Sequence, residues 1–90
     1  MSAAPGSVEG LALYHFDTCP YCLRVRAVLD QLGVDLELRD VLQDEGHSRE
    51  LIAANGRPTV PVLRIEEPDG SVSWLPESAD IVAYLVQRFG

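Results

Sequence analysis

The sequence predicts a single α/β domain whose elements follow the order βαβαββα. Three observations indicate this class: a short apolar run passes directly into an amphipathic stretch, two later apolar runs flank a Pro-Asp-Gly turn, and a further amphipathic stretch ends the chain. Ninety residues are enough for one such domain and too few for two. Residues 1–10 are small and aperiodic, so we expect a flexible leader there and the domain over residues 11–90.

The predicted elements of the first half are a strand at 11–16, a helix at 20–32, a strand at 36–41 and a helix at 49–55. The first helix carries apolar side chains every three or four positions and stops at Gly33, a residue typical of helix C-termini. The second strand nearly alternates apolar and charged residues, which indicates one exposed face. Ser48 is the expected N-cap of the second helix, and Gly56 is its expected end.

The second half is predicted to form a hairpin and a last helix. Residues 60–65 and 72–75 are the strands of this hairpin, because the Pro and Gly between them favour a tight turn. Residues 81–89 keep helical spacing, and the N-terminus of that helix is favoured by Pro76, Glu77, Ser78 and Asp80. Together the elements predict a four-stranded mixed sheet with helices on both faces.

The charge of the chain excludes several classes of partner. Fourteen acidic residues against seven basic ones give a net charge of −7, so the field repels nucleic acid and anionic lipid. All seven basic residues are Arg, which excludes lysine chemistry. No stretch is apolar enough for a membrane span or a signal peptide, so we expect neither export nor insertion and place the protein in the cytoplasm.

Both cysteines belong to one motif, Cys19-Pro20-Tyr21-Cys22, at the junction of the first strand and the first helix. With Cys19 at the N-cap and Pro20 at the first helical position, the Cys19 sulfur faces free backbone amides and the positive end of the helix dipole. These interactions favour the thiolate, so Cys19 is the expected nucleophile. Cys22 lies one turn further along, close enough to close a disulfide, and is the expected resolving thiol.

Two other interpretations of the cysteines are disfavoured. A zinc site could recruit His15, Cys19, Cys22 and His47, but structural zinc sites use two closely spaced ligand pairs and His47 is distant in sequence. A purely structural disulfide would close only a tiny loop, in a chain that nothing marks as secreted. We therefore expect no metal ligands, and we expect His15 to be a strand residue without a catalytic role.

These residues resemble a known family. The Cys19-Pro20-Tyr21-Cys22 motif, the segment Thr59-Val60-Pro61 before the hairpin and the element order are similar to those of the dithiol glutaredoxins, which have the thioredoxin fold. The segment that begins at Glu77-Ser78 also resembles the start of the last helix in glutathione S-transferase N-terminal domains. The resemblance covers nearly all of residues 11–89.

The resemblance implies a substrate-binding set made of Tyr21, Arg57, Thr59, Val60, Pro61, Glu77 and Ser78. Pro61 would follow a cis peptide bond, and the Val60 backbone would pair with the cysteinyl part of an extended thiol peptide. The γ-glutamyl end of that peptide would lie at Glu77 and Ser78, although plain helix capping is an alternative role for both residues. Arg57 would meet the other carboxylate.

The expected function is thiol-disulfide exchange on mixed or protein disulfides, through Cys19 with Cys22 resolving. Glutathione or another low-molecular-weight thiol is the expected reductant, no cofactor is bound permanently, and the protein is expected to be a monomer. The alternative is a non-catalytic module that binds a γ-glutamyl thiol or a partner protein. Iron-sulfur carriage by a dimer is weakened by Pro20, which stiffens the loop and removes an amide.

Overall fold

The computed structural model describes residues 7–57 and 59–90 and has the predicted order of elements. The strands are β1 (Ser7–His15), β2 (Asp35–Asp40), β3 (Val62–Glu66) and β4 (Val72–Leu75), and the helices are α1 (Pro20–Leu32), α2 (Glu45–Asn55) and α3 (Ser78–Phe89). No helix in this described part of the chain has the length and apolar character needed to cross a membrane.

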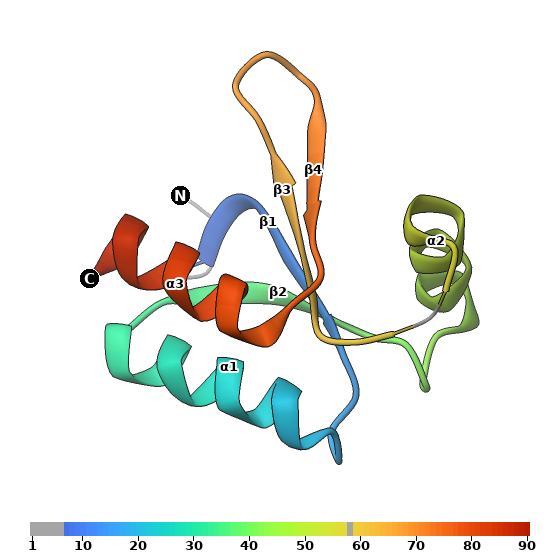
Figure 1. Ribbon diagram of the computed structural model, residues 1–90, viewed down its shortest axis with the longest axis horizontal. Helices are drawn as coiled ribbons and strands as arrows, with labels where there is room; N and C mark the ends of the chain where they lie inside the picture. Colours follow the sequence, from blue (N-terminus) through green and yellow to red (C-terminus); the bar gives the residue numbers. More distant parts are fainter. Residues whose placement is uncertain (1–6, 58) are drawn as a thin grey trace.

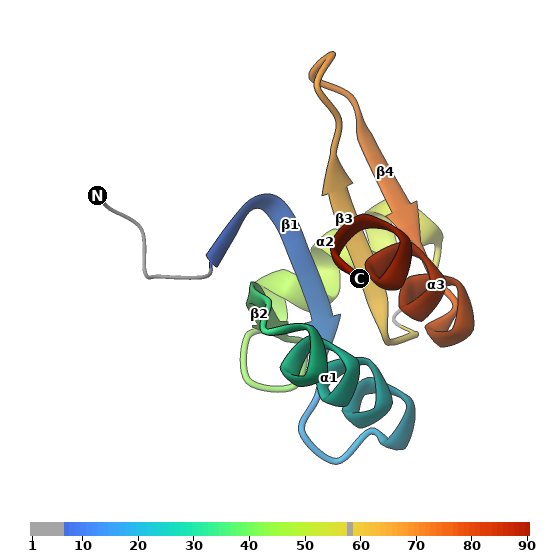
Figure 2. The same ribbon diagram turned by 90° about the vertical axis from the view of Figure 1, so that its left-hand side faces the viewer.

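The four strands form one mixed sheet in the order β2-β1-β3-β4. β1 and β2 are parallel, whereas β3 is antiparallel to both β1 and β4. Figure 1 shows α1 and α3 together on one face of the sheet and α2 on the other, and Figure 2 shows the β3–β4 hairpin projecting beyond the helices. The expected mixed sheet with helices on both faces is therefore confirmed.

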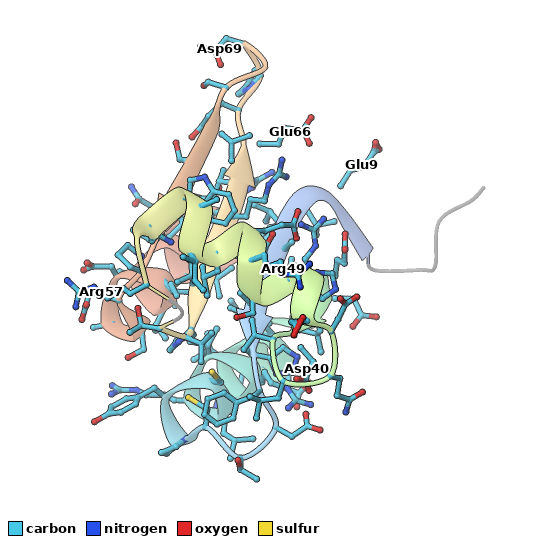
Figure 3. All side chains as sticks on the ribbon, turned by 90° about the vertical axis from the view of Figure 1, so that its right-hand side faces the viewer. Glu9, Asp40, Arg49, Arg57, Glu66 and Asp69 are labelled. Carbon is cyan, nitrogen blue, oxygen red and sulfur yellow. The ribbon has the colours of Figure 1, made fainter. Side chains whose placement is uncertain are left out.

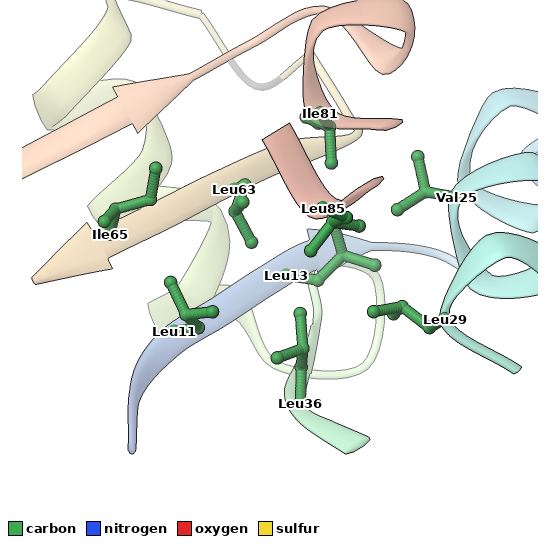
Figure 4. Close-up of a cluster of buried hydrophobic side chains, with 9 residues drawn as sticks. All are labelled: Leu11, Leu13, Val25, Leu29, Leu36, Leu63, Ile65, Ile81 and Leu85. Atoms are coloured by element: carbon green, nitrogen blue, oxygen red, sulfur yellow. The ribbon is translucent and has the colours of Figure 1, made fainter. Parts of the chain in front are cut away.

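The main core lies between the sheet and the pair α1 and α3 (Figure 4). Leu11 and Leu13 of β1 point to this side, because successive side chains of a strand alternate between its faces. Val25 of α1 and Leu85 of α3, both fully buried, close the core from the helix side. This packing fixes the position of α1, and with it the position of the cysteine motif at its start.

A smaller cluster lies under α2 on the other face of the sheet, where Tyr14 packs with Leu51 and Val62. Of the described residues of α2, Leu51 alone is buried. Apolar packing by itself therefore holds this helix to the sheet only weakly. A polar contact adds to it: the Tyr14 hydroxyl donates a 3.1 Å hydrogen bond to Glu50 and accepts a 2.7 Å bond from Arg39. Tyr14 thus links α2 to the sheet, and an ion pair of 3.7 Å between Arg39 of β2 and Glu50 of α2 adds to this attachment.

The boundaries of several elements differ from the prediction, most of all those of β1, α2 and β3. β1 begins at Ser7, so residues 7–10 of the expected leader belong to the sheet, and the positive φ of Gly10 (84°) marks an irregularity in its pairing with β2. Residues 1–6 of that leader lie outside the described part. β3 begins at Val62 instead of residue 60.

The start of α2 was also predicted wrongly. This helix begins at Glu45, and its N-cap is Asp44, whose side chain accepts a 2.8 Å hydrogen bond from the Gly46 amide; Ser48 lies inside the helix. Gly46 in the first turn hides the helical pattern, because glycine lowers helix propensity by about 1 kcal/mol. Gly56 does end the helix, as expected, with a φ of 81°.

Candidate active site

The cysteine motif has the geometry that the sequence predicts. Cys19 is the N-cap of α1 with extended backbone angles, Pro20 is the first helical residue, and Gly33 ends the helix in the left-handed conformation. The Sγ atom of Cys19 accepts a hydrogen bond of 3.3 Å from the backbone amide of Cys22. This bond and the positive end of the helix dipole both act on the Cys19 sulfur, as the predicted N-cap position requires.

The two thiols differ in their surroundings. Cys19 is 4% exposed and Cys22 is completely buried, and neither is in a disulfide. Burial, and then a hydrogen bond between the Cys22 thiol and the Cys19 side chain, raise the pKa of the Cys22 thiol to about 12. Cys22 therefore keeps its proton at neutral pH, and of the two sulfurs Cys19 is the one that borders solvent.

His15 is the last residue of β1, so it lies in a strand as predicted, and its side chain is buried, with 3% of the residue exposed. Burial, and then the positive charge of Arg26, lower the pKa of its imidazole, so the ring is neutral at pH 7. Within the described part of the chain the Nδ1 atom of His15 has no hydrogen-bond partner.

A pocket of about 520 Å³ lies beside the motif, between the start of α1, the connection from α2 to β3 and the start of α3. It is lined by all seven residues of the predicted binding set: Tyr21, Arg57, Thr59, Val60, Pro61, Glu77 and Ser78. Asn55 and Pro76 complete the lining and were missed, because no motif marks them in the sequence. Neither cysteine lines the pocket, and Tyr21, which is 62% exposed, is the motif residue that reaches it.

The Val60–Pro61 peptide bond is cis, as predicted. Pro61 is buried immediately before β3, while Val60 is partly exposed at the pocket wall. Residue 58, which lies between Arg57 and Thr59, is outside the described part. The segment that leads from α2 into β3 therefore forms one wall of the pocket.

Two residues of opposite charge face the pocket. Arg57 is exposed at the end of the α2 connection, where Figure 3 labels it, and Glu77 is exposed at the N-cap of α3. The Glu77 side chain makes no capping hydrogen bond to the described residues of the helix, so simple capping does not occupy it. The free amides of the first turn of α3 lie at the same wall, beside Ser78. A zwitterionic ligand with separated charges suits this arrangement.

Comparison with known proteins decides the family. The family model described as glutathione S-transferase, N-terminal domain matches residues 13–90. The chain belongs to this family. A solved structure of the same type, a glutathione transferase homolog from Drosophila mojavensis with bound glutathione, superposes with a TM-score of 0.72 at 29% identity, covering 89% of this chain and 35% of that one. The thioredoxin-like fold is thereby confirmed.

The curated relatives of this family member include glutaredoxins. Glutaredoxin 2 of Escherichia coli K12 is 32% identical over 75 residues, which are 83% of this chain and 32% of that protein. Glutaredoxin 3 of the same strain is 35% identical over 59 residues, which are 66% of this chain and 71% of that protein. The resemblance to glutaredoxins with a transferase-like last helix is confirmed, while the chain spans about a third of the length of Glutaredoxin 2.

Proposed function

We propose that the protein is a thiol-disulfide oxidoreductase of the glutaredoxin type, in which Cys19 attacks and Cys22 resolves. The hydrogen bond from the Cys22 amide to the Cys19 sulfur carries this proposal, because it holds the Cys19 sulfur at the start of the helical turn that also contains the Cys22 thiol. The Cys19 thiol lies at the helix N-terminus and accepts a backbone hydrogen bond, and the Cys22 thiol is buried and protonated. A protein that only binds a ligand does not need both.

The reaction takes two exchanges. The Cys19 thiolate attacks one sulfur of the substrate disulfide, the S–S bond breaks, and the other sulfur leaves as a thiolate that takes up a proton. Cys22 then loses its proton and attacks the Cys19 sulfur, which releases the remaining substrate thiolate and closes the Cys19–Cys22 disulfide. Two electrons have passed to the substrate. Two molecules of a small thiol then reduce the Cys19–Cys22 disulfide and become joined in a disulfide of their own, which supplies two electrons to the protein.

Glutathione is the small thiol that the pocket suits best, and a similar γ-glutamyl or cysteinyl thiol has the same groups. Its ammonium group would lie near Glu77, one carboxylate at the amides that begin α3, and the other carboxylate near Arg57. The Val60 backbone would hold the cysteinyl part and direct its sulfur toward Tyr21 and Cys19. The bound glutathione in the Drosophila mojavensis homolog supports this choice.

An assay with a glutathione mixed-disulfide reporter tests the proposal. The purified protein, supplied with glutathione, glutathione reductase and NADPH, should catalyse reduction of the reporter, and parallel assays with other small thiols identify the preferred reductant. Protein that binds glutathione but shows no turnover with any thiol would contradict the proposal and favour the binding module. We place this activity in the cytoplasm, where small-thiol pools keep such dithiols reduced.

A further inference from the structure

Three polar side chains converge at the carboxyl ends of the parallel strands β1 and β2. His15, the last residue of β1, pairs directly with Asp40, the last residue of β2, and Asp17 follows two residues after the end of β1. A ring nitrogen of His15 and one carboxylate oxygen from each aspartate all lie within 4.8 Å of one another. We propose that His15, Asp17 and Asp40 bind a divalent transition-metal ion.

The buried histidine supplies an observation that is independent of the two acids. His15 is 3% exposed, and its Nδ1 atom lacks a hydrogen-bond partner among the described residues. Buried polar atoms are nearly always paired, because an unpaired one loses its hydration without compensation. We assign Nδ1 as the ligand atom because a metal ion bound there would supply the missing partner, and a neutral imidazole is the form that ligates metals.

The donor set identifies the class of ion. Imidazole favours zinc and similar transition metals, whereas magnesium and calcium prefer sites made of oxygen alone. Donor atoms around a tetrahedral zinc ion lie about 3.4 Å apart, so these three side chains must approach slightly from their present spacing. Asp17 is exposed and can move to do so. Three protein ligands leave a coordination position for water.

Neighbouring groups act on the two acids in opposite ways. Oδ1 of Asp40 accepts hydrogen bonds from the backbone amides of Leu42 (2.9 Å) and Gln43 (3.1 Å), which orients the carboxylate and leaves Oδ2 for an ion. Oδ1 of Asp17 instead pairs with Arg26 at 3.3 Å. This exposed ion pair is weak, because water screens it. Arg26 therefore competes with a cation for Asp17 without preventing its binding.

The cluster lies outside the pocket that the proposed thiol ligand would occupy. None of its three residues lines the pocket, and Figure 3 shows Asp40 well away from Arg57. Within the described part of the chain, His15 is grouped with two aspartates, and not with the cysteines and His47 that the sequence offered as a zinc set. The inference therefore stands whether or not the protein reduces disulfides.

Binding is tested in a Cys19→Ser/Cys22→Ser protein without a histidine tag, because thiolates would otherwise bind the probe. Zinc titrated by calorimetry should show one saturable site per chain, and zinc should shift the ring resonances of His15 and leave those of His47 in place. Asp17→Asn and Asp40→Asn should each weaken binding at least about tenfold. Arg26→Gln should strengthen it, because the competing cation is gone.

Two matched variants serve as controls. Asp35→Asn removes an exposed acid at the other end of the same strand, and His47→Gln removes the one other histidine; neither should change the affinity for zinc. Absence of saturable binding would overturn the proposal. So would zinc affinity that is unchanged in both Asp17→Asn and Asp40→Asn, or lost in His47→Gln. Circular dichroism without metal verifies that each variant is folded.

Discussion

The backbone amide of Cys22 donates a 3.3 Å hydrogen bond to the sulfur of Cys19, while the thiol of Cys22 itself is fully buried. Cys22 therefore bonds to the Cys19 sulfur through its backbone, while burial keeps its own thiol protonated. Under the proposed mechanism this arrangement predicts that Cys19 reacts first, because Cys19 lies at the helix N-terminus with some exposed surface, whereas Cys22 is completely buried.

We expect this order to appear in alkylation. Iodoacetamide at pH 8, added to the reduced protein, should modify Cys19 at least about tenfold faster than Cys22, since thiolates and not thiols react. Mass spectrometry of peptides after short reaction times measures the two rates. In denaturant, where neither burial nor the helix remains, the rates should become similar. Faster modification of Cys22 in the folded protein would reverse the assignment of nucleophile and resolving thiol.

The buried thiol should also make the reduced protein sensitive to alkali. The pKa of Cys22 is about 12 in the folded protein against an ordinary value of 9.0, so the folded state retains a proton that the unfolded chain releases between these values. The resulting stability is complete below pH 9 and is lost as the pH rises toward 12. Urea denaturation at several pH values, in the presence of a reductant, measures the loss.

Cys22→Ala is the comparison for this alkaline loss. The free energy of unfolding of the variant should depend less on pH above 9 than that of the wild type. Tyr14, whose pKa is also raised by burial, is present in both proteins and contributes equally to both curves. If the free energies of unfolding of the two proteins changed equally with pH, the proton on Cys22 would not be the cause of the pH dependence.

The sequence was sufficient wherever local chemistry determines structure. Cys19 and Pro20 start α1 and Gly33 ends it as predicted, because capping and glycine conformation act within one turn. The start of α2 was missed for the same local reason, since Gly46 weakens the helical signal just after the true cap, Asp44. The seven binding residues recognised through the family resemblance line one pocket, although they come from three separate segments of the chain.

Contacts made by the tertiary fold could not be predicted in this way. Asp40 meets His15 only because β2 pairs with β1 in parallel, and no motif joins the two residues. Asn55 reaches the pocket because it is the last residue of α2 and this helix ends at the pocket, a placement that no motif in the sequence encodes. The Tyr14–Glu50 bond likewise joins a strand to a helix whose start was misplaced.

That bond is expected to contribute measurably to stability. Tyr14→Phe removes a fully buried hydroxyl that bonds to both Glu50 and Arg39, and should lower the free energy of unfolding by about 1–2 kcal/mol. Tyr84→Phe is the matched control, since its hydroxyl accepts a bond from Arg88 at the surface; its effect should stay below about 0.5 kcal/mol. Equal effects would mean that α2 is not held by Tyr14.

Glu77 should affect ligand binding and leave folding unchanged. Its side chain lines the pocket and makes no capping bond within the described helix, so Glu77→Gln should raise the KM for a glutathione mixed disulfide about 3- to 10-fold at unchanged Tm. Asp80→Asn removes an acid from the same first turn outside the pocket and should have little effect on KM. Similar changes in both variants would attribute the effect to the charge near the helix N-terminus and not to contact with the ligand.

Separate replacement of the two cysteines tests the proposed division of labour. Reduction of a glutathione mixed disulfide needs only Cys19, because a second molecule of glutathione can release the bound one, whereas reduction of a protein disulfide gains from the intramolecular attack of Cys22. Cys22→Ser should therefore retain activity on the mixed disulfide and lose most activity on a protein disulfide, while Cys19→Ser loses both. Steady-state rates with the two substrates measure this. Equal loss on both substrates in Cys22→Ser would show that the chemistry requires both sulfurs together, and the sequential mechanism would then be wrong.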